Sequence, residues 1–317
     1  MFAMNARRTA VFAALVGLAA CATTRAQRSA PVASFEAISF LGDTLRAIPL
    51  SAETRARYDR QLADARAAYD HTPTNADSIV WLGRRTAYLG RFREAIAIYT
   101  RGIERFPQNA WMYRHRGHRY ISVRELDRAI ADLDRGARLV QGKPDEVEPD
   151  GQPNAQNVPI GTLQSNIDYH LALAHYLKGD FARALPIYQR ELANARNDDR
   201  RVSIAYWYYL ALRRLGRDAE AAAVLVPITK DLRVIENDSY RDLLLMFKGD
   251  ISPDSVLRAA GTNTASVPFV TLAYGVGSWY ALNGRRDDAM QLWRRIVAGG
   301  QWPAFGYIAA EAELARR

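Results

Sequence analysis

Residues 76–109 read ADSIVWLGRRTAYLGRFREAIAIYTRGIERFPQN, and residues 110–143 continue as AWMYRHRGHRYISVRELDRAIADLDRGARLVQGK. The two stretches correspond at a spacing of 34 residues, so that Gly83 in the first matches Gly117 in the second. A repeat of this length is typical of proteins that stack copies of one small unit, because a single unit cannot bury its own apolar face. The same spacing relates Phe92 to Leu126 and Ala95 to Ala129.

Each copy predicts two helices joined by a tight turn. Apolar residues recur at i, i+3, i+4 and i+7, as Tyr169, Ala172, Leu173 and Tyr176 do, which is the period of an amphipathic helix. A glycine near the centre of a copy provides the left-handed conformation that often ends a helix. No alternating run of convincing length indicates a strand, so we expect an all-α fold. The central glycines are Gly90, Gly179, Gly216 and Gly284.

Six copies can be aligned along the chain. The fifth is irregular, because Asp242 stands where leucine is expected and Ser255 replaces the mid-repeat alanine. With Leu-Gly early, Ala in the middle and Pro near the end, the pattern resembles the tetratricopeptide repeat (TPR). The resemblance covers nearly all of residues 51–317. It implies an all-α, TPR-type α-solenoid of stacked antiparallel helical hairpins, with about six repeats plus capping helices. The five clear copies begin at Ala76, Ala110, Ser165, Val202 and Val270.

An insertion separates the second and third copies, which begin 55 rather than 34 residues apart. Its four prolines exclude a helix, so we expect an inserted loop over residues 142–164. Three interpretations stay open: a lid over the concave face, a Ca²⁺ site, or a solvated spacer. A Ca²⁺ site would use Asp145, Glu148 and Asp150, but these acids lack the order of a helix-loop-helix calcium loop.

The N-terminus predicts export. Arg7 and Arg8 precede an apolar run of 11 residues and then the ending Leu-Ala-Ala-Cys21, which is the order of a secretory signal peptide over residues 1–20. The run is about half of the ~20 residues that a spanning helix needs. The ending resembles the lipobox of bacterial lipoproteins, which implies cleavage before Cys21 and lipidation of that residue. The alternative is an ordinary signal peptide with an incidental cysteine.

The lipoprotein resemblance also sets the expected organisation of the chain. A tether follows over residues 21–50, of which Phe35 to Leu50 is the more apolar part and is expected to dock on the first helices. The TPR superhelical domain then occupies residues 51–317. Because Ala22 rather than aspartate follows the cysteine, the resemblance implies the periplasmic side of the outer membrane.

The net charge and the cysteine count indicate which classes of partner fit the chain. The chain carries a net charge of +9, and Arg7 and Arg8 are the only charged residues of the expected signal peptide, which leaves +7 on the rest. A single cysteine excludes internal disulfides, so stability must come from apolar packing. An exported, lipid-anchored protein is not expected to bind nucleic acid; anionic headgroups or acidic peptide segments fit the positive charge better.

The TPR resemblance further implies a concave groove lined by the first helix of each repeat. At one groove position four consecutive copies carry tyrosine. Tyrosine gives contact area at low entropic cost, and arginine clamps carboxylates with two bonds, so this groove suits extended peptides with acidic residues or a C-terminal carboxylate. The alternative is that the tyrosines pack between neighbouring helices. The expected groove residues are Arg84, Tyr88, Trp111, Arg114, His118, Tyr169, Tyr176, Tyr206, Arg213, Arg214, Tyr240 and Tyr274.

No sequence motif predicts an enzyme. His115 and His118 stand three residues apart, yet no zinc-protease motif, nucleophile elbow or phosphate loop accompanies them, so we expect no cofactor and no metal. We therefore expect a lipid-anchored scaffold or adaptor that binds peptide segments of other cell-envelope proteins in its groove. A peptidoglycan or carbohydrate binder and a periplasmic hydrolase are the alternatives. The partner, the pathway and the oligomeric state do not follow from the sequence.

Overall fold

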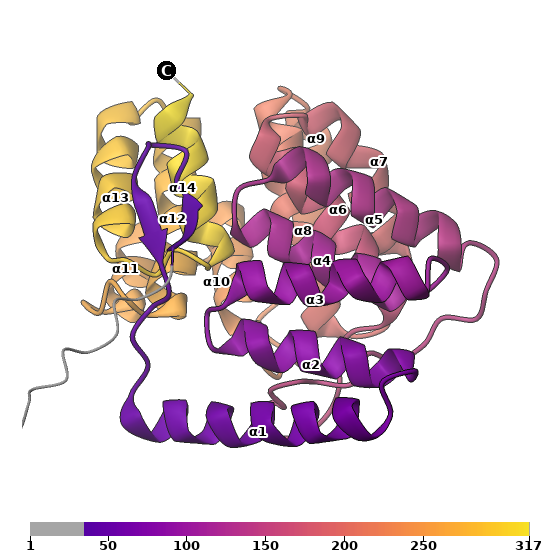
Figure 1. Cartoon of the computed structure of the whole chain (residues 1–317). Helices are drawn as coiled ribbons and strands as arrows, with labels where there is room; N and C mark the ends of the chain where they lie inside the picture. Colours follow the sequence, from indigo (N-terminus) through magenta and orange to yellow (C-terminus); the bar gives the residue numbers. More distant parts are fainter. Residues whose placement is uncertain (1–34, 317) are drawn as a thin grey trace, which may run out of the picture. The chain divides into compact units, whose positions relative to one another are not determined.

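The computed structural model describes residues 35–316 (Figure 1). By its internal contacts the chain divides into two units, Met1–Val32 and Ala33–Arg317, and every residue whose structure is described below lies in the second. The expected signal peptide, Cys21 and the first part of the expected tether lie outside the described residues. Among the helices of residues 35–316, none is long and apolar enough to cross a membrane.

The expected all-α fold is confirmed: twelve helices in the described part of the chain form six consecutive hairpins, and each hairpin packs on its neighbours (Figure 1). Two further helices flank them. Helix α1 (Ala52–His71) packs on α2, and α14 (Phe305–Ala315) packs on α12 and α13. The hairpins are α2 (Ala76–Tyr88) with α3 (Phe92–Arg105), α4 (Ala110–Ser122) with α5 (Leu126–Val140), α6 (Leu163–Lys178) with α7 (Phe181–Ala193), α8 (Asp198–Arg214) with α9 (Asp218–Leu225), α10 (Asp238–Lys248) with α11 (Pro253–Ala260), and α12 (Val267–Leu282) with α13 (Arg286–Ala298).

The repeated glycine explains how the two helices of a hairpin approach each other. A Cβ atom added at Gly83 would lie 2.4 Å from the ring of Tyr99, so only glycine lets this tyrosine rest against the backbone of α2. The same relation holds between Gly117 and Leu133, where the distance would be 2.7 Å. The 34-residue spacing in the sequence therefore records a steric requirement of helix packing.

A short antiparallel pair of strands, which the sequence did not predict, occupies the end of the expected tether. Strands β1 (Phe35–Ile38) and β2 (Thr44–Arg46) pair directly. The carboxylate of Glu36 accepts a hydrogen bond from the backbone N–H of Arg93, the second residue of α3, at 3.0 Å. The indole N–H of Trp302, just before α14, donates to the carbonyl of Arg46 at 2.7 Å. The strands thus contact both the first repeat and the segment just before α14.

Helix α14 is buried along most of its length. Besides α12 and α13 it contacts α6, and Phe305 at its first position lies against the rings of His118 and His170, with centroids 5.4 and 5.7 Å apart. Residues of the second and third repeats are therefore covered by the C-terminal helix.

Candidate functional site

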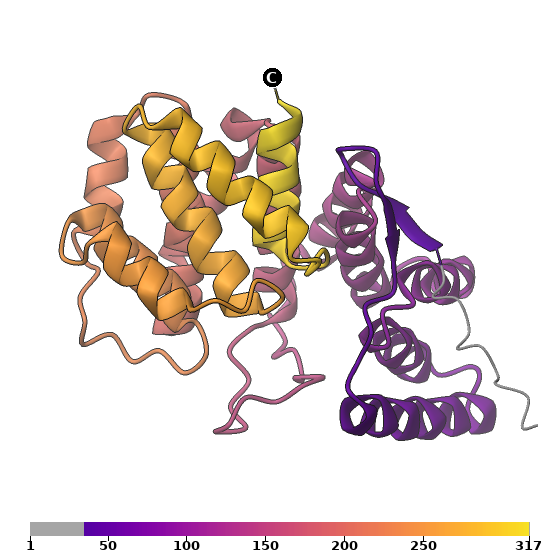
Figure 2. The same ribbon diagram turned by 90° about the vertical axis from the view of Figure 1, so that its left-hand side faces the viewer.

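The loop between α5 and α6 leaves the helices and returns to them as a long irregular segment (Figure 2). Two backbone hydrogen bonds hold its ends together: Glu148 N donates to Gly161 O at 3.0 Å, and Leu163 N donates to Glu146 O at 2.8 Å. Between these points residues 146–152 run across α2 and α4; we call them the bound loop segment. Of the three interpretations of the insertion, the lid is the one that expects contact with the helices; a lid role for the loop stays a prediction.

Glu148 is the centre of this contact, since its side chain points inward and is 5% exposed. Its Oε2 lies 2.9 Å from Arg114 Nε and its Oε1 lies 3.9 Å from Arg84 Nη2. Asn166, in the first turn of α6, donates its amide N–H to Oε2 at 2.8 Å. Both arginines are themselves buried, so the Glu148 carboxylate is bound by positive charges in a place that is shielded from solvent.

The residues after Glu148 are recognised through their backbone. Arg84 Nη2 donates to the carbonyl of Pro149 at 2.8 Å, and Arg85 Nη1 donates to the carbonyl of Gly151 at 2.6 Å. Gly151 lies flat on Tyr88, where an added Cβ would meet the phenol oxygen at 1.8 Å. Backbone carbonyls taken by side-chain donors are a general means of binding an extended peptide.

The next contact comes from α1. The hydroxyl of Tyr58 donates to the side-chain carbonyl of Gln152 at 2.8 Å. We call the set formed by Tyr58, Arg84, Arg85, Tyr88 and Arg114 the recognition face. It spans the first two repeats and the helix before them.

A cavity of about 100 Å³ lies beside Glu148 on the same helices. Arg114 Nη1 lies 3.2 Å from His115 Nδ1 and 3.3 Å from His118 Nδ1. Because an arginine can only donate, both Nδ1 atoms accept, and each ring carries its proton on Nε2. Burial, and then the nearby arginines, hold the pKa of both imidazoles well below the ordinary value. The cavity is lined by Arg84, Ala87, Tyr88, Tyr99, Arg114, His115, His118, Arg119 and Glu148.

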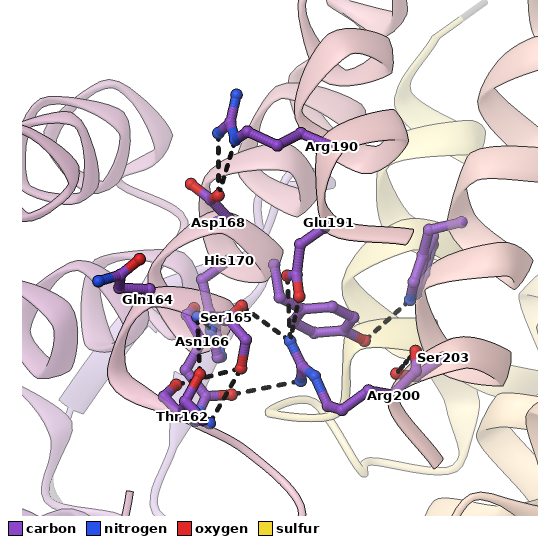
Figure 3. A network of polar contacts seen from close by, with 12 residues as sticks. Thr162, Gln164, Ser165, Asn166, Asp168, His170, Arg190, Glu191, Arg200 and Ser203 are labelled. Carbon is purple, nitrogen blue, oxygen red and sulfur yellow. Dashed lines mark hydrogen bonds and ion pairs between the residues drawn. The ribbon is translucent and has the colours of Figure 1, made fainter. Parts of the chain in front are cut away.

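A polar network extends from this site into the third and fourth repeats (Figure 3). The amide oxygen of Asn166 accepts from Arg200 Nη1 at 3.3 Å, and Arg200 Nη2 lies 3.1 Å from Glu191 Oε2. Burial raises the pKa of Glu191, and with the opposing effect of the Arg200 guanidinium included the value is about 7. Glu148 is thus connected through two side chains to a second buried carboxyl on α7.

The expected groove residues separate into two groups. Arg84, Tyr88, Arg114 and His118 converge on the bound loop segment and the cavity. Trp111 lies next to them, with its ring stacked on His115 at a centroid distance of 6.3 Å. The structure therefore brings together the part of the prediction that falls on the first two repeats.

The tyrosines of the later repeats pack against one another. The hydroxyls of Tyr176 and Tyr274 lie 2.8 Å apart, and the rings of Tyr206 and Tyr240 are 5.0 Å apart. Tyr169 has its hydroxyl 3.5 Å from that of Tyr240. Tyr240 is half-buried and the other four are buried, so a ligand has little access to this row in the described structure. This packing agrees with the second of the two interpretations; a role in peptide binding stays a prediction.

The two expected groove arginines of α8 have other partners. Arg213 Nε lies 2.8 Å from Asp218 Oδ1 in the adjacent α9. Arg214 Nη1 lies 2.7 Å from Glu313 Oε1 on α14. Neither joins the recognition face.

Sequence reasoning missed several members of the site. Arg85 and Tyr58 fall outside the family's groove positions, and Glu148 was considered only for Ca²⁺. Two of the three acids of that Ca²⁺ interpretation have separate partners: Glu148 pairs with Arg114, and Asp145 Oδ1 accepts from Gln164 N at 3.0 Å. Arg119 could have been found from its i+4 spacing to His115, which places both on one face of α4.

Comparisons with known proteins find similarity to solved structures but none in sequence. No protein-family model matches the chain, and no curated protein matches it in sequence. Among solved structures, "YrrB: a TPR protein with an unusual peptide-binding site" is 14% identical over 74% of this chain and 91% of that chain, with a TM-score of 0.43. A chain of the Naa15/Naa10 complex bound to HypK-THB is 17% identical over 76% of this chain, with a TM-score of 0.36. The Cut9–Hcn1 hetero-tetramer of APC/C gives 12% identity over 78% of this chain, with a TM-score of 0.34. The matches cover 34% of the Naa15/Naa10 chain and 57% of the Cut9–Hcn1 chain.

Proposed function

We propose that this chain is a protein-binding scaffold, not an enzyme, and that an extended acidic peptide segment of a partner occupies the recognition face in place of the bound loop segment. One observation carries the proposal. The chain already holds a short acidic peptide of its own there, Glu-Val-Glu-Pro-Asp-Gly-Gln at residues 146–152, through one carboxylate and two backbone carbonyls.

The contacts explain which partner would be accepted. The backbone carbonyls that Arg84 and Arg85 bind are present in every peptide, so they supply affinity without selecting a sequence. Selection comes from Arg114, which requires an acid where Glu148 now lies. Selection also comes from Tyr88, which leaves no room for a side chain three residues further on, at the position of Gly151.

The proposal also includes the cellular location of this scaffold. The lone cysteine at the end of Leu-Ala-Ala-Cys21 supports lipidation, and Ala22 after it supports the outer membrane. Under this proposal the repeats face the periplasm, and the partners are other proteins of the cell envelope. The alternative of a peptidoglycan or carbohydrate binder receives no support from the tyrosine row, because sugar stacking requires exposed rings and these are mostly buried.

A labelled peptide with the sequence PDEVEPDGQP, corresponding to residues 144–153, tests the proposal by fluorescence polarisation. We expect the chain to bind it, and the variant Glu148→Gln to bind it more tightly because the competing loop is weakened. Arg114→Ala should weaken binding by at least tenfold, since removing one partner of a buried ion pair costs about 3–5 kcal/mol.

The matched control is Arg101→Ala, which removes an exposed arginine from the neighbouring α3. It should leave the affinity unchanged. Equal loss of binding in Arg101→Ala and Arg114→Ala would show that the peptide is attracted only by net positive charge, and would overturn the proposal. The proposal would also be overturned if the peptide bound neither the parent chain nor the variant Glu148→Gln.

A further inference from the structure

The cavity beside Glu148 has more positive charge than its own acids neutralise. Three guanidinium groups line it, those of Arg84, Arg114 and Arg119, and Glu148 is the one carboxylate among the lining residues. Asp150 lies near Arg84 but does not line the cavity. Within residues 35–316 no carboxylate lies within ion-pair distance of Arg119, which is partly buried. A desolvated cation without an anion is costly, so this arrangement is adapted to a negative group that the chain itself does not supply.

The hydrogen-bond donors at the cavity are also in excess. His115 is 5% exposed, and its Nε2 has no hydrogen-bond partner among the described residues; the nearest carboxylate atom, Glu148 Oε1, is 3.9 Å away. Arg114 Nε lies 2.9 Å from Glu148 Oε2 but is not aligned for a hydrogen bond. Since most buried polar atoms in proteins are paired, two unpaired donors at one cavity indicate a missing acceptor.

The pKa of Arg119 also indicates an excess of positive charge at the cavity. The pKa of the Arg119 guanidinium is lowered to about 10, chiefly by burial, with Tyr99 opposing the shift and Arg114 and Arg84 adding to it. The like charges of the three arginines therefore repel each other across the cavity. An anion placed among them would relieve this repulsion and, by the same interaction, raise the pKa values of His115 and His118.

We propose that this cavity binds a small oxyanion, a carboxylate or a phosphoryl group, between Arg119, Arg114 and the Nε2–H of His115. The volume of about 100 Å³ holds roughly three water molecules at about 30 Å³ each, which limits the occupant to one such group or to the end of a longer ligand. The site goes beyond the peptide contact, because the loop uses Arg84, Arg85 and Arg114. Among the described residues Arg119 has no carboxylate partner, although it lies over the Phe92 ring, and His115 Nε2 has no hydrogen-bond partner.

Titration with sodium phosphate and, separately, with sodium acetate tests the site in the whole chain at constant ionic strength set by chloride. The readout is the NMR signals of the imidazoles of His115 and His118 near pH 7. We expect saturable shifts with at least one of the two anions. Saturation by phosphate alone identifies a phosphoryl site, and saturation by acetate alone identifies a carboxylate site.

Substitutions at Arg119 test whether the anion binds in this cavity. Arg119→Gln should weaken binding of the saturating anion at least tenfold. Arg119→Lys keeps the positive charge and should retain most of the affinity; it serves as the second test if Arg119→Gln folds poorly. Arg101→Gln is the control and should change nothing. No saturable shift with either anion, or equal affinity in Arg119→Gln and the parent chain, would overturn the proposal. Because free anions are the probe, this outcome is separate from failure of the peptide to bind.

Discussion

Arg124 and Glu311 lie 187 residues apart in the chain and form a buried, bidentate ion pair. Nε and Nη2 of the arginine each lie 2.9 Å from a carboxylate oxygen, and Nη2 also donates to the carbonyl of Trp302. Arg124 occupies the turn between α4 and α5 with a φ of +68°, a conformation that glycine adopts in the corresponding turns at Gly90 and Gly216. A non-glycine residue there is unfavourable, so the pair compensates for local strain by joining the second repeat to α14.

Removing one partner of this pair should be strongly destabilising. Glu311→Gln leaves the Arg124 guanidinium buried without its anion, and we expect the free energy of unfolding to fall by about 3–5 kcal/mol in denaturant titrations. The control is Glu220→Gln, which breaks an exposed pair with Arg217 and should cost less than about 1 kcal/mol. Similar losses in both variants would contradict the structural role assigned to Glu311.

The repeated glycine should tolerate no side chain. Gly83→Ala places a Cβ atom 2.4 Å from the Tyr99 ring, and overpacking of this kind costs about 1–3 kcal/mol. The double variant Gly83→Ala/Tyr99→Leu should lose less free energy of unfolding than the sum of the two single variants, because the smaller leucine leaves room for the added Cβ atom. Strict additivity in thermal or chemical unfolding would show that the two residues do not press on each other.

The buried Glu191 predicts a pH dependence of stability. Folding raises its pKa from 4.5 to about 7, chiefly through burial, against the opposing effect of Arg200. Between these two values the folded chain keeps a proton that the unfolded chain has released, so the free energy of unfolding falls as the pH rises through this window. Below it both states are protonated and the full stability is present. Glu191→Gln should flatten the dependence by on the order of 1–3 kcal/mol, whereas Asp127→Asn on the exposed surface should leave it intact.

The proposed anchor can be tested apart from the fold. Cys21→Ser removes the sulfur that lipidation requires, so the variant should no longer incorporate labelled fatty acid and should leave the membrane fraction of bacterial cells. Ser29→Ala in the same segment serves as the control and should keep the label. Unchanged membrane association of Cys21→Ser would contradict lipid anchoring.

The hairpins could be predicted because their signals are local. Gly83, Gly117 and Gly216 mark close approaches or turns within one repeat, and the apolar period lies along single helices. The strand pair β1–β2 could not, because each strand is only three or four residues long. Its position depends on long-range partners such as Trp302, which lies 256 residues from Arg46.

The site was only half predictable for the same reason. Arg84 and Arg114 stand at periodic positions on first helices, so the repeat pattern located them. Their partner Glu148 comes from an insertion without any period, and no spacing rule relates it to α4. The burial of Tyr176 and Tyr274 depends on how later repeats and α14 pack, which the pattern of one repeat does not contain.

Hydrogen exchange of the bound loop segment tests the central claim, replacement of the loop by a partner's peptide, most directly. The backbone N–H of Glu148 donates to Gly161 O and that of Leu163 donates to Glu146 O, so both amides are protected while the loop is in place. Addition of saturating PDEVEPDGQP peptide should speed exchange at Glu148 in the bound loop segment and at Leu163 beside it, while α4 stays protected. Peptide binding that leaves the exchange of this segment unchanged would contradict the account.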